Sequence, residues 1–192
     1  MHDSPRPIAV VDANVLFPLS LRDVLLRAVE KGLFRLRISR QIWDEVIRNL
    51  VATGRMTPER AAYLDIRVRE FLAEHDALVS DYESLIPTLT NNPKDRHVLA
   101  VAVHARAETI VTFNLRHFPS RALASHNTVA EHPDVFLSRL YGNAPDVLAA
   151  IVREQAAGLH NPPMTVSEVL NTLAQHVPTF VSRIRSKLEH TE

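Results

Sequence analysis

Several segments of the chain have the hydrophobic pattern of β-strands. Residues 8–11 and 109–112 are apolar runs rich in β-branched side chains, which is typical of strands buried on both faces of a sheet. Residues 34–38 alternate between apolar residues and arginine, which predicts a strand with one wetter face. Residues 77–80 predict a short fourth strand, and residues 128–130 are a candidate fifth.

Helix signals fill the intervals between these strands. A threonine followed by a proline, as at Thr57 and Pro58, is typical of a helix start. Strands that alternate with helices predict an α/β fold with a central, mostly parallel sheet. The expected helix signals are a capping-box-like start at Ser20 and Asp23, an end at Gly32, an N-cap at Ser39 for a helix to about residue 51, the Thr57 helix to about residue 75, and helices over residues 95–107 and 133–141.

The pattern changes after Tyr141. No strand signal follows, and prolines separate three helical segments, expected over residues 146–157, 166–176 and 179–188. We therefore predict two domains, an α/β domain over residues 1–141 and a helical C-terminal extension over residues 142–192.

Composition excludes several classes of protein. The chain has no cysteine, which excludes a disulfide scaffold and any cysteine-ligated zinc site. No apolar run approaches the roughly 20 residues of a membrane helix, and residues 1–7 lack a signal-peptide core, so we expect a cytoplasmic protein. The 22 basic residues equal the 22 acidic ones, so net charge gives no support to nonspecific nucleic-acid binding.

Polar residues follow two of the predicted strands and open one helix. Asp12 follows the first strand, Asn114 follows the strand at 109–112, and Asp95 begins a helix. Taken singly, each has an ordinary explanation as a turn or helix-cap residue. Because strand ends and helix starts lie at one edge of a parallel sheet, we expect all three to converge there. Clustered carboxylates repel unless a cation neutralises them, and oxygen ligands suit Mg²⁺ or Mn²⁺.

Two further sets of polar residues are weaker indications of an active site. Asn14 stands two residues after Asp12, a position from which it can orient the carboxylate. In the helix after Ser39, Asp44 and Glu45 both fall opposite the apolar stripe, so periodicity does not choose between them.

Two histidines belong to the predicted helix at 95–107. His97 and His104 lack the spacing of a zinc-binding pair, and we expect packing or surface roles for both.

Four segments together resemble the PIN-domain proteins, and most closely the VapC-type ribonuclease toxins. The resemblance covers roughly residues 8–141 and implies a three-layer α/β/α sandwich, Mg²⁺- or Mn²⁺-dependent RNA cleavage, and an acidic centre of Asp12, Glu45 and Asp95. Glu45 is preferred to Asp44 by this resemblance alone. The segments are Val-Asp-Ala-Asn-Val-Leu at 11–16, Trp-Asp-Glu-Val-Ile-Arg-Asn at 43–49, Pro-Lys-Asp-Arg-His-Val-Leu-Ala at 93–100, and Val-Thr-Phe-Asn-Leu-Arg-His-Phe-Pro at 111–119.

The chain departs from the family pattern at one position. PIN domains usually carry a fourth acid in a Thr-x-Asn-x-x-Asp-Phe segment, and here His117 stands in its place while Asn114 keeps the asparagine. A histidine is able to coordinate Mn²⁺ or to act as an acid or base near neutral pH. It is equally consistent with a weakened second metal site or a lost activity, and both alternatives stay open.

The expected function is a metal-dependent endoribonuclease. Hydroxide attacks the phosphodiester in line while the cation stabilises the developing charge. In this hypothesis Asp12 and Asp95 bind the cation, Glu45 completes the pocket, Asn114 orients water or a phosphate oxygen, His117 has a supporting role, and Lys94, Arg96 and Arg116 contact RNA phosphates.

The resemblance also implies partners, and two other functions remain as alternatives. A VapB-like antitoxin and a homodimer are usual in the family. The first alternative is a non-catalytic PIN module that binds RNA or protein, which the departure at His117 motivates. The second, a small-molecule enzyme, is weaker, because the chain has only four glycines and no glycine-rich phosphate motif.

Overall fold

The described residues of the computed structural model, 6–190, form two compact units. Unit 1 contains Phe34–Glu131 and the described part of Met1–Phe17, and unit 2 contains Pro18–Leu33 and the described part of His132–Glu192. The predicted domain boundary after Tyr141 stays a prediction. Of residues 1–7, for which we expected no signal-peptide core, residues 1–5 lie outside the described residues.

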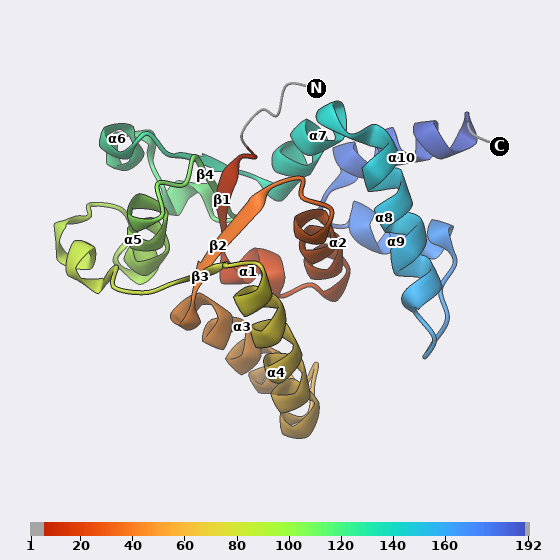
Figure 1. The fold of residues 1–192 in the computed structure, drawn as a ribbon, viewed down its shortest axis with the longest axis horizontal. Helices are drawn as coiled ribbons and strands as arrows, with labels where there is room; N and C mark the ends of the chain where they lie inside the picture. The colour runs from red at the N-terminus through yellow and green to blue at the C-terminus, as the bar shows by residue number, and fades with distance from the viewer. Residues whose placement is uncertain (1–5, 191–192) are drawn as a thin grey trace. The chain divides into compact units, whose positions relative to one another are not determined.

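Unit 1 is built on a five-stranded sheet in the order β3-β2-β1-β4-β5 (Figure 1). All four strand pairings are parallel, which confirms the predicted α/β class with a central parallel sheet. The strands are β1 (Ile8–Val11), β2 (Arg35–Ser39), β3 (Leu78–Val79), β4 (Thr109–Val111) and β5 (Val129–Glu131).

The two central strands explain the apolar runs in the sequence. Val10 and Val11 of β1 and Ile110 of β4 are fully buried, as expected for strands that are covered on both faces. Val11 pairs with Val111, so the two strands end side by side. The residues that follow them, Asp12 and Thr112, therefore emerge next to each other at the carboxyl edge of the sheet.

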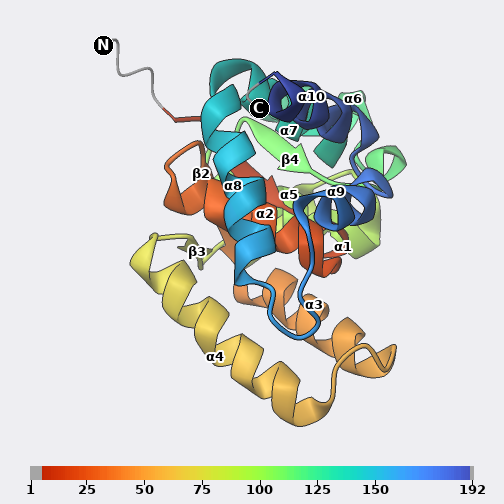
Figure 2. The ribbon, with the colours of Figure 1, turned by 90° about the vertical axis from the view of Figure 1, so that its right-hand side faces the viewer.

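Two long helices of unit 1 form a hairpin. Helix α3 (Arg40–Ala52) begins at Ser39, whose hydroxyl accepts a hydrogen bond from Ile42 N, and α4 (Pro58–Glu74) begins at Thr57. The indole Nε1 of Trp43 donates to Asp65 Oδ1 at 2.9 Å, which joins the two helices. Figure 2 shows α3 and α4 side by side. This bond and the burial of Trp43 fix the orientation of α3, the helix that carries Glu45.

Helix α5 (Arg96–His104) packs against β1, β2 and β4. It is apolar nearly all round, and Val98–Ala102 are buried, because the helix is enclosed by protein on most sides. The remaining elements of unit 1 are α1 (Ala13–Leu16), α6 (Ser120–Leu123) and the 3₁₀ turns Glu83–Thr88, Pro93–Asp95, Leu115–His117 and Ala124–His126.

In the described part of unit 2 the regular elements are all helices, which are joined by loops. Helix α2 is tied to α8 by an ion pair between Lys31 and Glu154 at 2.8 Å and by a hydrogen bond from Gln155 Nε2 to Ser20 O. The five helices are α2 (Leu19–Glu30), α7 (Pro133–Asn143), α8 (Pro145–Gly158), α9 (Val166–Ala174) and α10 (Pro178–Glu189). The predicted helical C-terminal region is confirmed, and Thr165 and Glu168 form a capping box at the start of α9.

Two predicted helix ends are wrong. We expected a capping box at Ser20 and Asp23, but α2 begins after Pro18, Ser20 lies inside the helix and Asp23 pairs with Arg27 instead. Helix α5 ends at His104 rather than residue 107, because the chain turns there through Arg106 with a positive φ of 52°.

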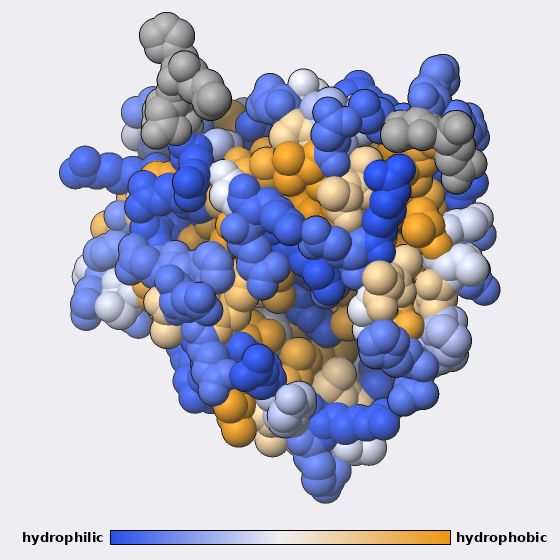
Figure 3. Space-filling view, turned by 45° about the vertical axis from the view of Figure 1, so that its right-hand side comes forward, coloured by the Kyte–Doolittle hydropathy of each residue, from blue (hydrophilic) through white to orange (hydrophobic). Residues whose placement is uncertain are grey.

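The surface gives little information by itself. The face in Figure 3 is mostly hydrophilic, with hydrophobic residues between the polar ones, as on most folded proteins. Tyr63 and Ile66 of α4 are among the exposed large apolar residues. Within residues 6–190, none of the helices combines the length and apolar character that a membrane-spanning segment requires.

We expect Asp134→Ala to destabilise unit 2. The Asp134 carboxylate accepts hydrogen bonds from Phe180 N at 2.8 Å and Thr179 N at 3.1 Å, so it satisfies two donors in the first turn of α10. Losing such a cap costs about 1–2 kcal/mol of the free energy of unfolding, measurable by urea denaturation. Asp146→Ala is the matched control, because Asp146 also follows the first proline of its helix but is 81% exposed and pairs only with Lys187 among the contacts described. Equal losses in both variants would contradict the assignment.

Candidate active site

Asp12 is a buried carboxylate at the end of β1. Its backbone N–H donates to Val111 O at 3.0 Å, which continues the sheet by one residue before the chain turns into α1. Only 3% of its surface is exposed. A carboxylate in such a place needs hydrogen-bond donors or a cation to compensate for lost hydration.

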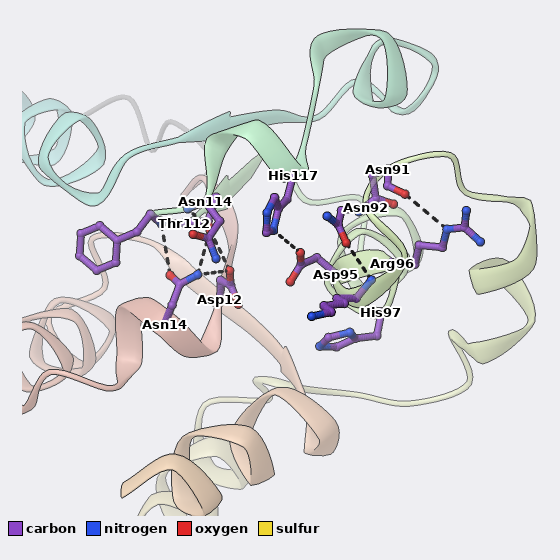
Figure 4. A network of polar contacts seen from close by, with 12 residues as sticks. Asp12, Asn14, Asn91, Asn92, Asp95, Arg96, His97, Thr112, Asn114 and His117 are labelled. Atoms are coloured by element: carbon purple, nitrogen blue, oxygen red, sulfur yellow. Dashed lines mark hydrogen bonds and ion pairs between the residues drawn. The ribbon is translucent and has the colours of Figure 1, made fainter. Parts of the chain in front are cut away.

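Asn14 and Thr112 supply donors to this carboxylate (Figure 4). Asp12 Oδ2 accepts from Asn14 Nδ2 at 2.6 Å and from Thr112 Oγ1 at 2.7 Å. Asn14 Oδ1 in turn accepts from Phe113 N at 3.2 Å, and Thr112 Oγ1 accepts from Asn114 N at 3.0 Å. These bonds lock the ends of β1 and β4 together and fix the orientation of Asp12, the orienting contact that we predicted for Asn14.

Asp95 is held by His117. Asp95 occupies the N-cap position of α5, but its side chain does not cap the helix. Its Oδ2 instead contacts His117 Nδ1 at 2.6 Å. A second bond, from Asn92 N to His117 O at 3.2 Å, joins the same two loops through the backbone. The histidine at the position of the usual acid therefore contacts an acid of the centre directly.

Glu45 and its neighbour Asp44 have different surroundings in the structure. Asp44 pairs with Arg40 at 2.8 Å, and 44% of its side chain is exposed. The Glu45 side chain is 30% exposed and lies 3.5 Å from His97 Nε2 and 3.9 Å from Arg48 Nη2. Periodicity assigned both acids to a solvated face, because it does not account for α5 packing beside α3.

The three acids share one electrostatic environment. Burial raises the pKa of the Asp12 carboxyl, the hydrogen bond from Thr112 lowers it, and the charges of Asp95 and Glu45 raise it. Burial also raises the pKa of Glu45, which Arg48 lowers and Asp95 raises. Asp12, Glu45 and Asp95 are thus brought together at one edge of the sheet, where each negative charge disfavours the others.

His97 was not predicted to belong to this centre. It is 4% exposed, and burial lowers the pKa of its imidazole while the charges of Asp12 and Asp95 and a hydrogen bond to the Lys94 backbone raise it. Its position in a helix that is otherwise apolar was a signal that it is buried.

Thr112 was also missed. Its pairing beside Asp12 follows from the parallel register of β1 and β4, which a single sequence does not show.

The other predicted residues flank the acids. Lys94 and Arg116 are exposed, and Arg96 is half-buried with its Nε 3.4 Å from Asn91 O. Asn114 is held through its backbone N–H by Thr112. Lys94, Arg96 and Arg116 border the loops that carry Asp95 and His117, so they belong to the rim of the site. Asn114 instead joins the hydrogen-bond network around Asp12 through its backbone N–H.

The donor set fits a divalent cation in charge, although it is not a preformed cage. Three carboxylates with mutually unfavourable charges, beside a buried imidazole, form a centre that a cation would stabilise. Within residues 6–190, no group of three or more acidic and histidine side chains lies close enough to hold a metal ion. The side chains available for one are those of Asp12, Glu45 and Asp95.

In comparisons with known proteins, two family models match separate segments of the chain. A family model described as PIN domain matches residues 9–116, more than half of the chain. A second model, described as VapC50 C-terminal domain, matches residues 133–186.

One curated relative extends this similarity. A Mycobacterium tuberculosis protein named "Putative ribonuclease VapC50" is 39% identical over 109 residues, which are 57% of this chain and 64% of that protein. The match therefore spans less than two thirds of the relative's length. No solved structure matches the chain significantly.

In the absence of divalent cations, we expect Asp12→Asn to raise the free energy of unfolding at neutral pH. The raised pKa of Asp12 means that its charged form costs stability in the folded state, and an asparagine oxygen still accepts from Asn14 and Thr112. Because the folded-state pKa lies above the unfolded value, the wild type loses stability as pH rises through this window.

The gain should therefore vanish at low pH. It is measured by urea unfolding between about pH 3 and pH 7. Asp44→Asn is the matched control, since Asp44 has Arg40 as a partner and should show no such gain. A gain in Asp12→Asn that is independent of pH would contradict the electrostatic explanation.

Proposed function

Because the chain belongs to the PIN-domain family, we propose that it is a divalent-metal-dependent endoribonuclease and the toxin of a VapBC-like pair. The observation that supports this most strongly is the convergence of Asp12, Glu45 and Asp95. Besides burial, the charges of Asp95 and Glu45 raise the pKa of Asp12, and the charge of Asp95 raises the pKa of Glu45. The name of the mycobacterial relative, a ribonuclease, supports the same reaction class.

In this proposal Asp12, Glu45 and Asp95 hold Mg²⁺ or Mn²⁺. A cation bound there would polarise the phosphodiester and make water a better nucleophile. Asn14 and Thr112 keep the Asp12 carboxylate in one orientation. His117 does the same for Asp95, and Asn114 orients the attacking water or a phosphate oxygen.

The rim of the site supplies the RNA contacts. Lys94 and Arg116 are exposed beside the acids, and Arg96 is partly so. Their positive charges offset the repulsion between the acidic centre and an RNA backbone. Single-stranded or loop RNA is the favoured substrate, since its backbone is able to enter a concave site.

Partners follow from the same proposal. We propose a VapB-like antitoxin that inserts a basic peptide into the acidic centre, a homodimer, and action in the cytoplasm, where RNA and antitoxin occur together. The contact of His117 with Asp95 motivates the alternative of a non-catalytic PIN module, because a histidine has replaced the usual acid. RNA binding without cleavage in any divalent metal would favour that alternative.

Cleavage of RNA should depend on each acid and on the cation. Asp12→Asn, Glu45→Gln and Asp95→Asn each remove one negative charge that the cation requires, and we expect each to lower the cleavage rate at least about 100-fold. The assay follows a labelled RNA with Mn²⁺, with Mg²⁺ and with EDTA. Asp44→Asn is the matched control on the same helix, and it should retain wild-type activity. Full metal-dependent cleavage by Asp12→Asn would reject the assignment.

RNA affinity should depend less steeply on salt concentration when a positive charge is removed from the rim of the site. Lys94→Ala or Arg116→Ala removes one phosphate contact, and the slope of log affinity against log salt should fall by about 0.7 for each. Binding is measured by fluorescence anisotropy in the Asp12→Asn background, so that RNA stays intact. Arg67→Ala, an exposed α4 arginine paired with Glu70, should leave the slope unchanged. An identical change in the control would place the RNA elsewhere.

A further inference from the structure

His97 brings a nitrogen atom to a centre otherwise made of oxygen ligands. The residue lies at the start of α5, two positions after Asp95, and is 4% exposed. The side chains of Asp95 and His97 both leave α5 on the side where Asp12 lies (Figure 4). The proposed cleavage reaction gives this imidazole no role.

The Nε2 atom of His97 is buried and has no hydrogen-bond partner among the described residues. A buried polar atom without a partner is costly, so it requires an explanation such as an ion or a ligand. The nearest acidic atom is Glu45 Oε1 at 3.5 Å, a contact that does not meet the geometry of a hydrogen bond. His97 Nε2 and Glu45 Oε1 therefore lie within ion-pair distance but make no hydrogen bond.

The second ring nitrogen of His97 is already engaged. A hydrogen bond joins the imidazole to the Lys94 backbone. Because Nε2 has no partner, this contact with the Lys94 backbone falls to Nδ1. Donation from one ring nitrogen to a backbone carbonyl is the arrangement that orients metal-ligating histidines, because it directs the lone pair of the other nitrogen at the metal.

His117 does not offer a nitrogen in the same way. Its Nδ1 contacts Asp95 Oδ2 at 2.6 Å, and its backbone carbonyl accepts from Asn92 N. These contacts assign it to the positioning of Asp95. Of the two imidazoles beside the acids, His97 is the one with a fully buried ring nitrogen that has no hydrogen-bond partner among the described residues, whereas the His117 side chain is 20% exposed.

We propose that His97 Nε2 is a direct ligand of the divalent cation, beside Glu45, and that it makes the centre prefer Mn²⁺ to Mg²⁺. The inference rests on the proposed function, since it requires a cation at the acidic centre. Mg²⁺ favours an all-oxygen environment, whereas first-row transition ions accept imidazole nitrogen readily. The remaining ligands are carboxylate and water oxygens.

The test is pulsed electron paramagnetic resonance of Mn²⁺ bound to the full chain. A directly bound imidazole gives a nitrogen coupling in the echo modulation, and labelling the protein with ¹⁵N-histidine should replace the ¹⁴N pattern. We expect the coupling in the wild type and its loss in His97→Asn and in His97→Gln. Calorimetry should show about tenfold weaker Mn²⁺ binding in these variants and a smaller change for Mg²⁺.

Two matched variants identify the nitrogen. His104→Gln changes an exposed histidine of the same helix and should keep both the coupling and the affinity. His117→Gln should keep the coupling, because its imidazole is not bound to the ion. Loss of the coupling in His117→Gln together with its persistence in His97→Asn would overturn the inference.

The wild type alone already provides a decisive result. Mn²⁺ that binds without any nitrogen coupling overturns the role of His97, whether or not the variants fold. If RNA cleavage persists in that case, the proposed ribonuclease stands and only the nitrogen ligand is rejected. Absence of both Mn²⁺ binding and cleavage in the wild type rejects the ligand and the ribonuclease together.

Discussion

The repulsion among the carboxylates of Asp12, Glu45 and Asp95 is the unfavourable interaction that the rest of unit 1 has to overcome. Burial raises the pKa values of Asp12 and Glu45. The charges of Asp95 and Glu45 raise that of Asp12 further, and the charge of Asp95 raises that of Glu45 further. A fold gains nothing in stability from such an arrangement. The sheet core of fully buried Val10, Val11 and Ile110 supplies the apolar burial that keeps these acids together.

Short polar contacts fix each acid in place against that repulsion. Asp12 is held by Asn14 of α1 and by Thr112, which follows β4, and Asp95 is held from a neighbouring loop by His117. Glu45 has looser contacts and stands on α3, which Trp43 anchors to α4. The centre therefore combines two rigid acids with one that has more freedom to adjust to a ligand.

Local sequence signals predicted most of the fold, because its central strands are continuous apolar runs and its helix starts carry Ser39, Thr57 and Thr165 caps. The positions of Asp12 and Asp95 at the sheet edge followed from the same logic. The nearness of Glu45 and His97 to these acids did not, since it depends on side chains of α3 and α5 meeting in space. A helical period describes one helix face at a time and contains no information about such a meeting.

The bond between Thr112 and Asp12 joins residues 100 positions apart. Ribosomes synthesise a chain from its N-terminus, so Asp12 emerges long before the strand that holds it. A nascent or truncated chain that stops short of β4 lacks Thr112 and His117, and its earlier acids have no scaffold to gather them. The acidic centre is therefore assembled only after nearly all of unit 1 has been made.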